Sequence, residues 1–418
     1  LNSAFPASSL VSVTLQSFAP EDAEAVAAAV RAAGGEVEDT SSSSRWGLVR
    51  ATLPLGAIPA LAARGDVQWI EERPPVSTLN DQAAGASHLN LQKAWQVLDL
   101  TGRGQLIGHA DTGLDTGVTN TLHADFQGRV LALIARARPG DASDRNGHGT
   151  HTAGSILGSG AASAGQFRGV AWEAQLVHQS IANASGALTG LPADLYELFA
   201  ETYAFGACVH SDSWGADSYG AYDSYCRSTD LFAWDHPDHL AVFAAGNSGR
   251  DGDADGLVDP YSIASPAAAK NVLTVGAAEN DRLPGTGGYT SRRYSAFYDY
   301  FYPYALWFPV APLTDDYISY SATPSPYRQG LAAFSSRGPT QDGRIKPDLV
   351  APGTDVISCR SSLGGTGWGA YSSSYCFNGG TSMATPLVAG AAALMRQYAM
   401  TQIGLTNPSA ALVKAMLI

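Results

Sequence analysis

The stretch Asp111-Thr-Gly-Leu-Asp115 follows directly on an apolar run over residues 106–110 that is typical of a buried strand. Two further segments combine reactive side chains with glycine: Asn146-Gly-His-Gly-Thr-His-Thr-Ala-Gly154 and Gly380-Thr-Ser-Met-Ala-Thr-Pro386. The second of these runs into an apolar helix predicted over residues 387–398. A carboxylate, an imidazole and a hydroxyl therefore stand at a strand end, in a glycine-rich loop and at a helix start, where α/β proteins place their active sites.

Around these segments, apolar strands alternate with helical stretches. Strands are predicted over residues 106–110, 174–180, 207–210, 241–244 and 272–275, and helices over residues 151–157, 191–203 and 229–236. Repeated β-α alternation predicts an α/β fold in which a parallel sheet carries helices on both faces.

Asp111, His148 and Ser382 are the candidate catalytic residues. A serine hydroxyl is a poor nucleophile unless a base takes its proton, and the base needs an acid that fixes its tautomer. Ser382 lies at a predicted helix start, where N–H groups and the helix dipole favour developing negative charge. The alternative is that all three are ordinary turn residues.

Together these segments resemble the subtilase family of serine peptidases, in which Asp, His and Ser follow one another in this chain order. The resemblance covers roughly residues 80–418 and extends to Ala244-Ala-Gly-Asn-Ser-Gly249, where Asn247 resembles the side-chain donor to the oxyanion. His148 and His151 compete for the role of base. The resemblance assigns it to His148, between two glycines that allow close approach to Asp111, and we expect His151 to pack or hydrogen-bond within its helix.

The resemblance also implies a cleft in which a protein or peptide substrate binds as an extended strand. One wall of the first specificity pocket would be Ser213-Trp-Gly215, the other Ala244-Ala-Gly246, and Ala264-Ser-Pro-Ala267 would be the floor. The expected substrate-binding residues are Ser213, Trp214, Gly215, Ala244, Ala245, Gly246 and Ala264. Such an uncharged pocket predicts apolar or aromatic residues before the scissile bond, with broad tolerance.

A calcium site is predicted at Asp251-Gly-Asp-Ala-Asp-Gly-Leu-Val-Asp259. Carboxylates at loop positions 1, 3, 5 and 9, glycine at 6 and a carbonyl at 7 match a calcium loop. The expected ligands are Asp251, Asp253, Asp255, Leu257 and Asp259. Position 12 is Ser262 rather than glutamate, so the match is incomplete, and a solvated acidic turn is the alternative.

Residues 1–79 read as a separate α+β unit of order β-α-β-β-α-β. Among subtilases the chain looks most like the bacterial alkaline, oxidation-resistant proteases that carry a β-sandwich after the catalytic domain, and whose mature enzymes begin with Asn-Asp. That implies processing between Leu79 and Asn80, a propeptide that assists folding and blocks the cleft, and a catalytic domain over residues 80–418. A permanent N-terminal domain is the alternative. No segment matching the β-sandwich follows the last predicted helix.

Composition argues against two classes of binding partner, nucleic acids and membranes. The formal charge of -13 argues against nucleic acid, because phosphate binding needs a basic face. No apolar run approaches the roughly 20 residues that cross a bilayer, so no membrane partner is expected. A start at Leu1 without a targeting peptide fits a processed, secreted protein, although a trimmed sequence would look the same.

Four cysteines fall into two local pairs, Cys208 with Cys226 and Cys359 with Cys376. We expect disulfides within these pairs, since secretion would favour them, and four buried thiols are the alternative.

Three features depart from the family pattern or from the alternating scheme. His109 occupies a normally apolar strand position, so we expect a hydrogen-bonded core histidine, with tuning of Asp111 as the alternative. Asp212 stands where asparagine is common and is predicted to add charge beside the cleft. The aromatic-rich segment 281–333 is expected to fold back on the core. An inactive binding protein or a peptide ligase would be the competing functions.

Overall fold

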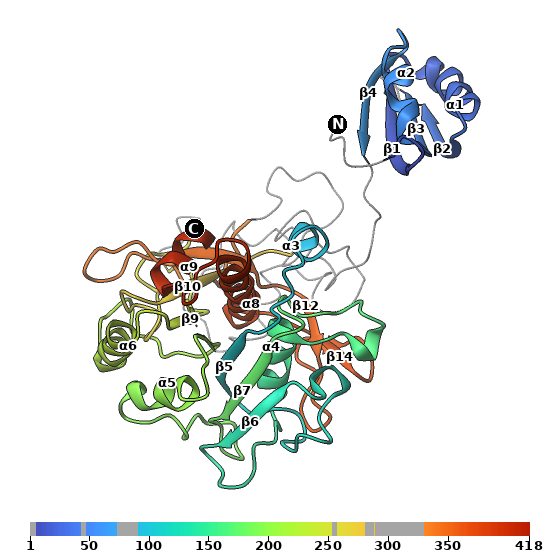
Figure 1. Cartoon of the computed structure of the whole chain (residues 1–418). Coiled ribbons are helices and arrows are strands. Elements are labelled where there is room, and N and C mark those ends of the chain that lie inside the picture. The colour runs from blue at the N-terminus through green and yellow to red at the C-terminus, as the bar shows by residue number, and fades with distance from the viewer. Residues whose placement is uncertain (1–5, 43–46, 73–90, 253–256, 281–287, 289–329) are drawn as a thin grey trace. The chain divides into compact units, whose positions relative to one another are not determined.

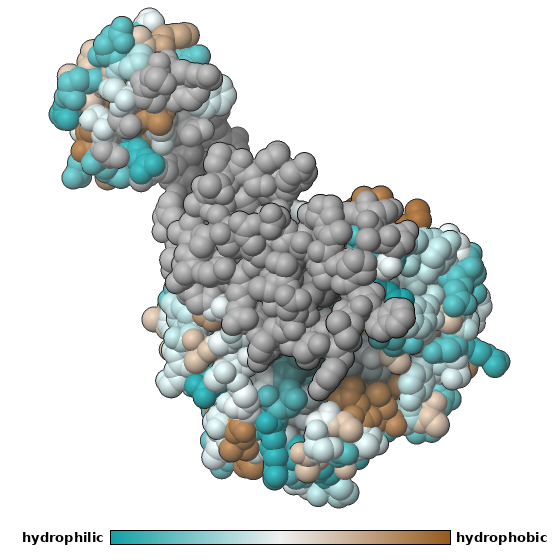
Figure 2. Space-filling view, turned by 180° about the vertical axis from the view of Figure 1, so that it is seen from behind, coloured by the Kyte–Doolittle hydropathy of each residue, from teal (hydrophilic) through white to brown (hydrophobic). Residues whose placement is uncertain are grey.

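The computed structural model describes residues 6–42, 47–72, 91–252, 257–280, 288 and 330–418. The chain divides into two compact units, Leu1–Ser77 and Thr78–Ile418 (Figure 1). The predicted linker before residue 80 and nearly all of the aromatic-rich segment 281–333 lie outside the described residues. The face drawn in Figure 2 is mainly hydrophilic where it is described, with small hydrophobic patches.

The N-terminal unit is one antiparallel sheet with two helices. Its strands lie in the order β2-β3-β1-β4 and span Leu10–Ser17 (β1), Glu36–Ser42 (β2), Gly47–Pro54 (β3) and Val67–Glu72 (β4). The helices are α1 (Ala23–Ala32), preceded by the short 3-10 turn η1 (Pro20–Asp22), and α2 (Ile58–Ala62), preceded by η2 (Leu55–Ala57). Alternate β1 and β3 residues meet the apolar side of α1 in a core of their own, so the helix and strand periods agree with the fold.

The larger unit is built on a seven-stranded parallel sheet of order β11-β10-β9-β8-β5-β7-β6. Its strands are β5 (Leu106–Asp111), β6 (Val130–Ala135), β7 (Gln175–Ser180), β8 (Val209–Asp212), β9 (Leu240–Ala244), β10 (Leu273–Ala278) and β11 (Leu349–Pro352). The five predicted strands are present, and β6 and β11 at the two edges were missed. This is the α/β architecture that the sequence predicted.

Helices cover both faces of this sheet. One apolar cluster packs α4 (His148–Leu157) and α8 (Thr381–Thr401) on one face, and a second packs α5 (Leu195–Tyr203) and α6 (Ser224–Asp235) on the other (Figure 1). The described residues also form α3 (Leu91–Gln96), α9 (Ala410–Leu417) and the short 3-10 turns η3 (Ala124–Phe126) and η4 (Ala161–Ser163). Helices α5 and α6 begin at residues other than predicted, because Asp194 and Asp223 accept N-cap hydrogen bonds there.

The predicted disulfides are wrong: all four cysteines are free thiols. Cys359 and Cys376 lie on neighbouring strands of a small sheet formed by β12 (Val356–Cys359), β13 (Gly369–Ala370) and β14 (Tyr375–Asn378). Cys376 pairs with Ser358 and Cys359 with Tyr375, so the two thiols face opposite sides of that sheet. Cys208 precedes β8, whereas Cys226 contacts Ser265 beyond that strand's other end.

Within the described part of the chain, no helix combines the length and the apolar character that crossing a bilayer requires.

Candidate active site

Asp111 and His148 form a close pair at the carboxyl end of β5. His148 Nδ1 lies 2.7 Å from Asp111 Oδ1, and the backbone N–H of Thr112 donates to the same oxygen at 2.7 Å. Burial opposes the charged carboxylate, but His148 and His109 outweigh it and hold the pKa of Asp111 well below its ordinary value. Burial likewise opposes the imidazolium of His148, but the Asp111 charge and hydrogen bond prevail and raise its pKa.

The approach of α4 to β5 depends on two glycines. Gly147 precedes the helix with φ +97°, and a Cβ on Gly149 would lie 2.3 Å from the Gly113 carbonyl oxygen. Asp144 was not predicted from the sequence. It accepts hydrogen bonds from the Gly147 and Thr150 N–H groups, which have no carbonyl partner within the first turn of α4. The spacing of an aspartate three residues before a glycine at the helix start was a usable signal for it.

His151 is buried one turn further along α4 and takes no part in the pair. Its Nε2 contacts the carbonyl oxygens of Val356 and Cys376 at 3.1 and 3.3 Å, so it bonds to the small sheet rather than within its own helix. Burial lowers its pKa to about 4.

Ser382 is the second residue of α8, beside the carboxyl end of β8. Its hydroxyl donates to the Ser213 carbonyl at 2.9 Å. Pro386 has no N–H to offer the Ser382 carbonyl four residues earlier, and Ser213 Oγ donates to that carbonyl instead, at 2.8 Å. Ser213 and Ser382 therefore exchange two hydrogen bonds, each hydroxyl donating to the backbone carbonyl of the other residue.

Asn247 lies next to this helix start, in the loop after β9 (Leu240–Ala244). Its Oδ1 accepts from Thr381 N at 2.8 Å and from Thr381 Oγ1 at 3.0 Å. Two donors on the oxygen fix the orientation of the amide, and the NH₂ group remains to donate elsewhere. A Cβ on Gly380 would lie 3.5 Å from Asn247 Nδ2, which places the amide beside the backbone that leads to Ser382.

The predicted pocket segments converge. Cβ atoms built on Gly215 and Gly246 would lie 3.2 and 3.1 Å from the Ala264 methyl, so the two walls and the floor meet at these three residues. Trp214 Nε1 donates to the Ala110 carbonyl at 3.0 Å and ties one wall to β5. Ala244 and Ala245 are buried, and Ala264 N donates to the Ala245 carbonyl.

Asp212 does not add charge to the cleft, contrary to prediction. It is fully buried on the α5 and α6 side of the sheet and lies 2.8 Å from His210 Nδ1. Burial raises its pKa, although His210 opposes the shift. Strand alternation explains the difference, because Asp212 pairs with Ala110 and shares that residue's face, whereas Asp111 points to the other one.

Only part of the predicted calcium loop is described, because Asp253 and Asp255 lie outside the described residues. The two ends of the loop are joined: Gly252 N donates to Asp259 Oδ2 at 2.9 Å, and Asp259 N donates to the Arg250 carbonyl at 2.6 Å. The Asp259 carboxylate therefore faces the segment that carries Asp251, and Leu257 is exposed. An oxygen-only donor set on a closed loop fits a hard cation such as calcium.

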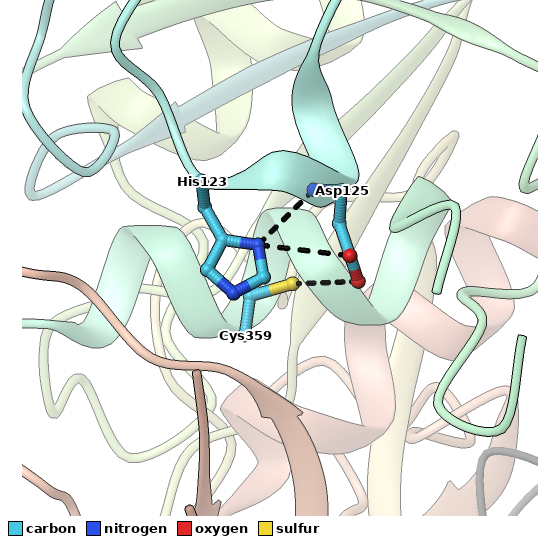
Figure 3. A group of neighbouring side chains, drawn as sticks. All are labelled: His123, Asp125 and Cys359. Carbon is cyan, nitrogen blue, oxygen red and sulfur yellow. Dashed lines mark hydrogen bonds and ion pairs between the residues drawn. The ribbon is translucent and has the colours of Figure 1, made fainter. Parts of the chain in front are cut away.

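Among the described residues, another group could hold a metal ion: His123, Asp125 and Cys359, with ligand atoms within 4.8 Å of one another (Figure 3). Its carboxylate accepts from Cys359 Sγ, Tyr375 OH and Ala162 N, and His123 Nδ1 accepts from Asp125 N. Burial raises the pKa of the Cys359 thiol well above its ordinary value. These mutually hydrogen-bonded groups, with their sulfur and nitrogen donors, are distinct from the predicted calcium loop.

Comparison with known proteins identifies the family. The model of the Subtilase family, Peptidase_S8, matches residues 102–418. The chain therefore belongs to the subtilases, whose members are serine peptidases that hydrolyse peptide bonds.

Individual relatives are distant. Serine protease AprX of Bacillus subtilis is 30% identical over 77% of this chain and 63% of its own length. Serine protease/ABC transporter B family protein tagD of Dictyostelium discoideum is also 30% identical, over 77% of this chain. A solved cold-adapted subtilisin-like serine proteinase gives a TM-score of 0.45 at 24% identity, covering 76% of this chain and 82% of that one. The chain spans between about a fifth and two thirds of the length of these curated relatives.

Proposed function

We propose that this chain is a serine endopeptidase that cleaves protein or peptide substrates through an acyl-enzyme on Ser382. The observation that carries the proposal is the 2.7 Å contact between Asp111 Oδ1 and His148 Nδ1, on a helix that packs against the one carrying Ser382. That contact places the Nδ1 proton against the carboxylate and leaves Nε2 as the basic nitrogen. Membership of the subtilase family supports the same reading.

The proposed reaction uses four side chains. The Ser382 hydroxyl leaves its acceptor, the Ser213 carbonyl, and passes its proton to His148 Nε2 as Oγ attacks the substrate carbonyl carbon. Asp111 stabilises the imidazolium, and the Asn247 amide donates to the oxyanion. His148 then protonates the leaving amine as the C–N bond breaks, and a water molecule hydrolyses the acyl-enzyme by the same steps in reverse.

The proposed specificity follows from the pocket. Gly215, Gly246 and Ala264 present no charge, so a charged side chain before the scissile bond would lose its hydration without a partner. Quenched peptides that differ only at this position should give kcat/KM roughly ten-fold or more higher for Phe and Leu than for Asp and Lys. Product masses from the same assay distinguish hydrolysis from ligation. An equal rate for charged and apolar residues would refute the proposed pocket, and ligated products would favour the peptide-ligase alternative.

Calcium is proposed as a structural ion on the loop of Asp251, Asp253, Asp255, Leu257 and Asp259, just after Asn247. When bound it would neutralise the clustered carboxylates and stiffen this wall of the cleft. Chelation with EGTA should lower the melting temperature by about 5 °C, since a ligand held far above its Kd adds roughly 2–3 kcal/mol of stability.

The control for calcium is a pair of matched variants. Asp259→Asn keeps the acceptor for Gly252 N but removes the charge, and should lose most of the EGTA effect. Glu197→Gln removes one exposed charge on α5 and should retain it. An identical EGTA response in wild type and Asp259→Asn would reject the site.

Residues 1–79 are proposed as a propeptide that assists folding and blocks the cleft until it is cut at Leu79–Asn80. The support is a self-contained core in the N-terminal unit, which lets it fold as a separate body. Cleavage in purified protein is the measurement that tests it, and the Ser382 variant below supplies the control. Secretion stays a prediction from the sequence, and four free thiols add no support to it.

A further inference from the structure

The two oxygens of the Asp111 carboxylate have different partners. Oδ1 receives His148 Nδ1 and Thr112 N, both at 2.7 Å. Oδ2 faces Thr152 Oγ1 at 3.2 Å and His109 Nε2 at 3.6 Å. Because Asp111 is only 2% exposed, these two groups, rather than bulk water, decide how well Oδ2 is satisfied.

Thr152 and His109 are joined to each other. His109 Nε2 lies 3.0 Å from Thr152 Oγ1, and both residues are fully buried. The threonine hydroxyl has one proton, and its possible acceptors are Asp111 Oδ2 and the His148 and Gly149 carbonyls at 3.1 Å. The charged oxygen is the strongest acceptor of the three in a dry site. The hydroxyl therefore donates to Asp111 if His109 donates to it.

His178 on β7 selects the tautomer of His109 that makes this possible. The two Nδ1 atoms lie 3.0 Å apart, so one donates and the other accepts. His178 Nε2 is buried and has no partner among the described residues. A proton there would be an orphaned donor, so the proton of His178 belongs on Nδ1, and burial keeps this ring neutral by lowering its pKa. His109 then accepts at Nδ1 and carries its proton on Nε2, where it donates to Thr152 Oγ1.

We infer that His109 and Thr152 are positioning residues for the catalytic carboxylate, and that His178 sets the tautomer on which they depend. Thr152 Oγ1 donates to Oδ2 and His109 Nε2 donates in turn to Thr152 Oγ1, so this chain of hydrogen bonds stops the carboxylate from turning about its Cβ–Cγ bond and keeps Oδ1 directed at His148. It also draws negative charge away from the His148 contact, which limits how far Asp111 raises the basicity of that ring. The inference adds to the proposed protease mechanism and rests on it for the kinetic consequence alone.

The groups that face His109 are few. Asp111 lies on its own strand, His178 on β7, and Thr152 and His148 on α4. The adjacent β8 residue, Ser211, is uncharged, whereas His210 and Asp212 lie on the opposite face of the sheet. Two further carboxylates act electrostatically on this group, since Asp212 interacts with His109 and Asp111, and Asp144 helps to raise the pKa of His148; the variants of Thr152 and His109 leave both carboxylates in place.

The test compares two conservative pairs. Thr152→Val removes the hydroxyl at constant shape and Thr152→Ser keeps it; His109→Leu removes the donor and His109→Gln offers an amide N–H in its place. The Val and Leu variants should lose roughly three- to ten-fold in kcat at unchanged KM, because neither residue touches substrate. The acidic limb of the pH–rate profile of these two variants should move to higher pH. The reason is that an Asp111 carboxylate with fewer hydrogen-bond donors raises the pKa of His148 further. The Ser and Gln variants should stay near wild type.

A second measurement works without turnover. In a Ser382→Ala background, NMR titration of the His148 ring should show a pKa raised by roughly half a unit or more in the Val and Leu variants. His239→Asn, a buried histidine at the amino end of β9, is the control for a general loss of packing and should leave that pKa unchanged. A His148 pKa unaffected by Thr152→Val overturns the inference, even if His109→Leu fails to fold. An inactive wild type would instead refute the proposed function, and the titration would still decide this point.

Discussion

Replacing Ser382 with alanine is expected to lower kcat on a peptide substrate on the order of a million-fold. This magnitude is the one that subtilisin itself shows, and it is carried over through family membership. Without Oγ no acyl-enzyme forms, and the base has no proton to remove. The Asn247 amide and the pocket remain, so the residual rate should still exceed the uncatalysed one by roughly a thousand-fold. Steady-state kinetics with a quenched peptide measures both quantities.

The control is Ser155→Ala. Ser155 is fully buried in α4, where its hydroxyl donates to the His151 carbonyl of the same helix. Its loss should leave kcat within a few-fold of wild type. Turnover that survives in Ser382→Ala would overturn the proposed mechanism.

The same variant tests the fate of residues 1–79. If the chain cuts itself, N-terminal sequencing of purified wild type should find Asn80, whereas Ser382→Ala should keep Leu1. An intact, fully active wild-type chain would make the first unit a permanent domain.

Replacing Asp111 with asparagine is expected to lower kcat roughly ten-thousand-fold while KM changes little. The Thr112 N–H and the Thr152 hydroxyl both point donors at this side chain, and an amide can offer an acceptor to only one side. When the NH₂ group lies toward His148, the ring accepts at Nδ1 and its proton moves to Nε2. The nitrogen that should take the serine proton is then already protonated.

The pH dependence of kcat/KM tests whether Asp111 raises the pKa of His148. In wild type the Asp111 charge raises the pKa of His148, and the base must be neutral to work, so kcat/KM should fall as pH drops through a value above 6.5. In Asp111→Asn the attraction is gone, and the acid limb should move to lower pH on a much lower plateau. A profile with an unmoved limb would mean that Asp111 does not set the basicity of His148.

Asp212→Asn is the matched control for Asp111→Asn. Like Asp111, Asp212 is buried and lies close to a histidine nitrogen, at 2.8 Å from His210 Nδ1. It belongs to the neighbouring strand but faces the other side of the sheet. The kcat of Asp212→Asn should stay within a few-fold of the wild-type value. Comparable losses in both variants would show that burying an amide, rather than losing the catalytic acid, causes the effect.

The N-terminal unit was predictable almost element by element. Its strands β1 and β3 alternate buried with more exposed residues, and Gly34-Gly35 follows its first helix. Such local signals act within a few residues of the chain and need no knowledge of the fold. The five central strands of the larger sheet were found for the same reason, because each is a short apolar run.

Other elements were missed. The edge strand β6 is an apolar run, Val-Leu-Ala-Leu-Ile-Ala, and so was a usable signal, although its edge position leaves it only partly buried. The other edge strand, β11, has only four residues and ends in proline, which is a weak signal for a strand. The disulfide prediction failed because sequence proximity says nothing about which face of a strand a thiol occupies. In β12 and β14 the pairing register turns Cys359 and Cys376 to opposite faces.

The sequence by itself determined the fold class and the family resemblance, and it singled out Asp111, His148, Ser382 and Asn247 as candidate catalytic residues, because each lies in a short segment whose spacing reflects local backbone demands. Only the tertiary structure decided what surrounds them. His109, Thr152 and His178 come from three elements and meet behind Asp111 because neighbouring parallel strands and a covering helix bring them onto one face. Asp212 pairs with Ala110, the residue before Asp111, so strand alternation places it in the core on the opposite face of the sheet.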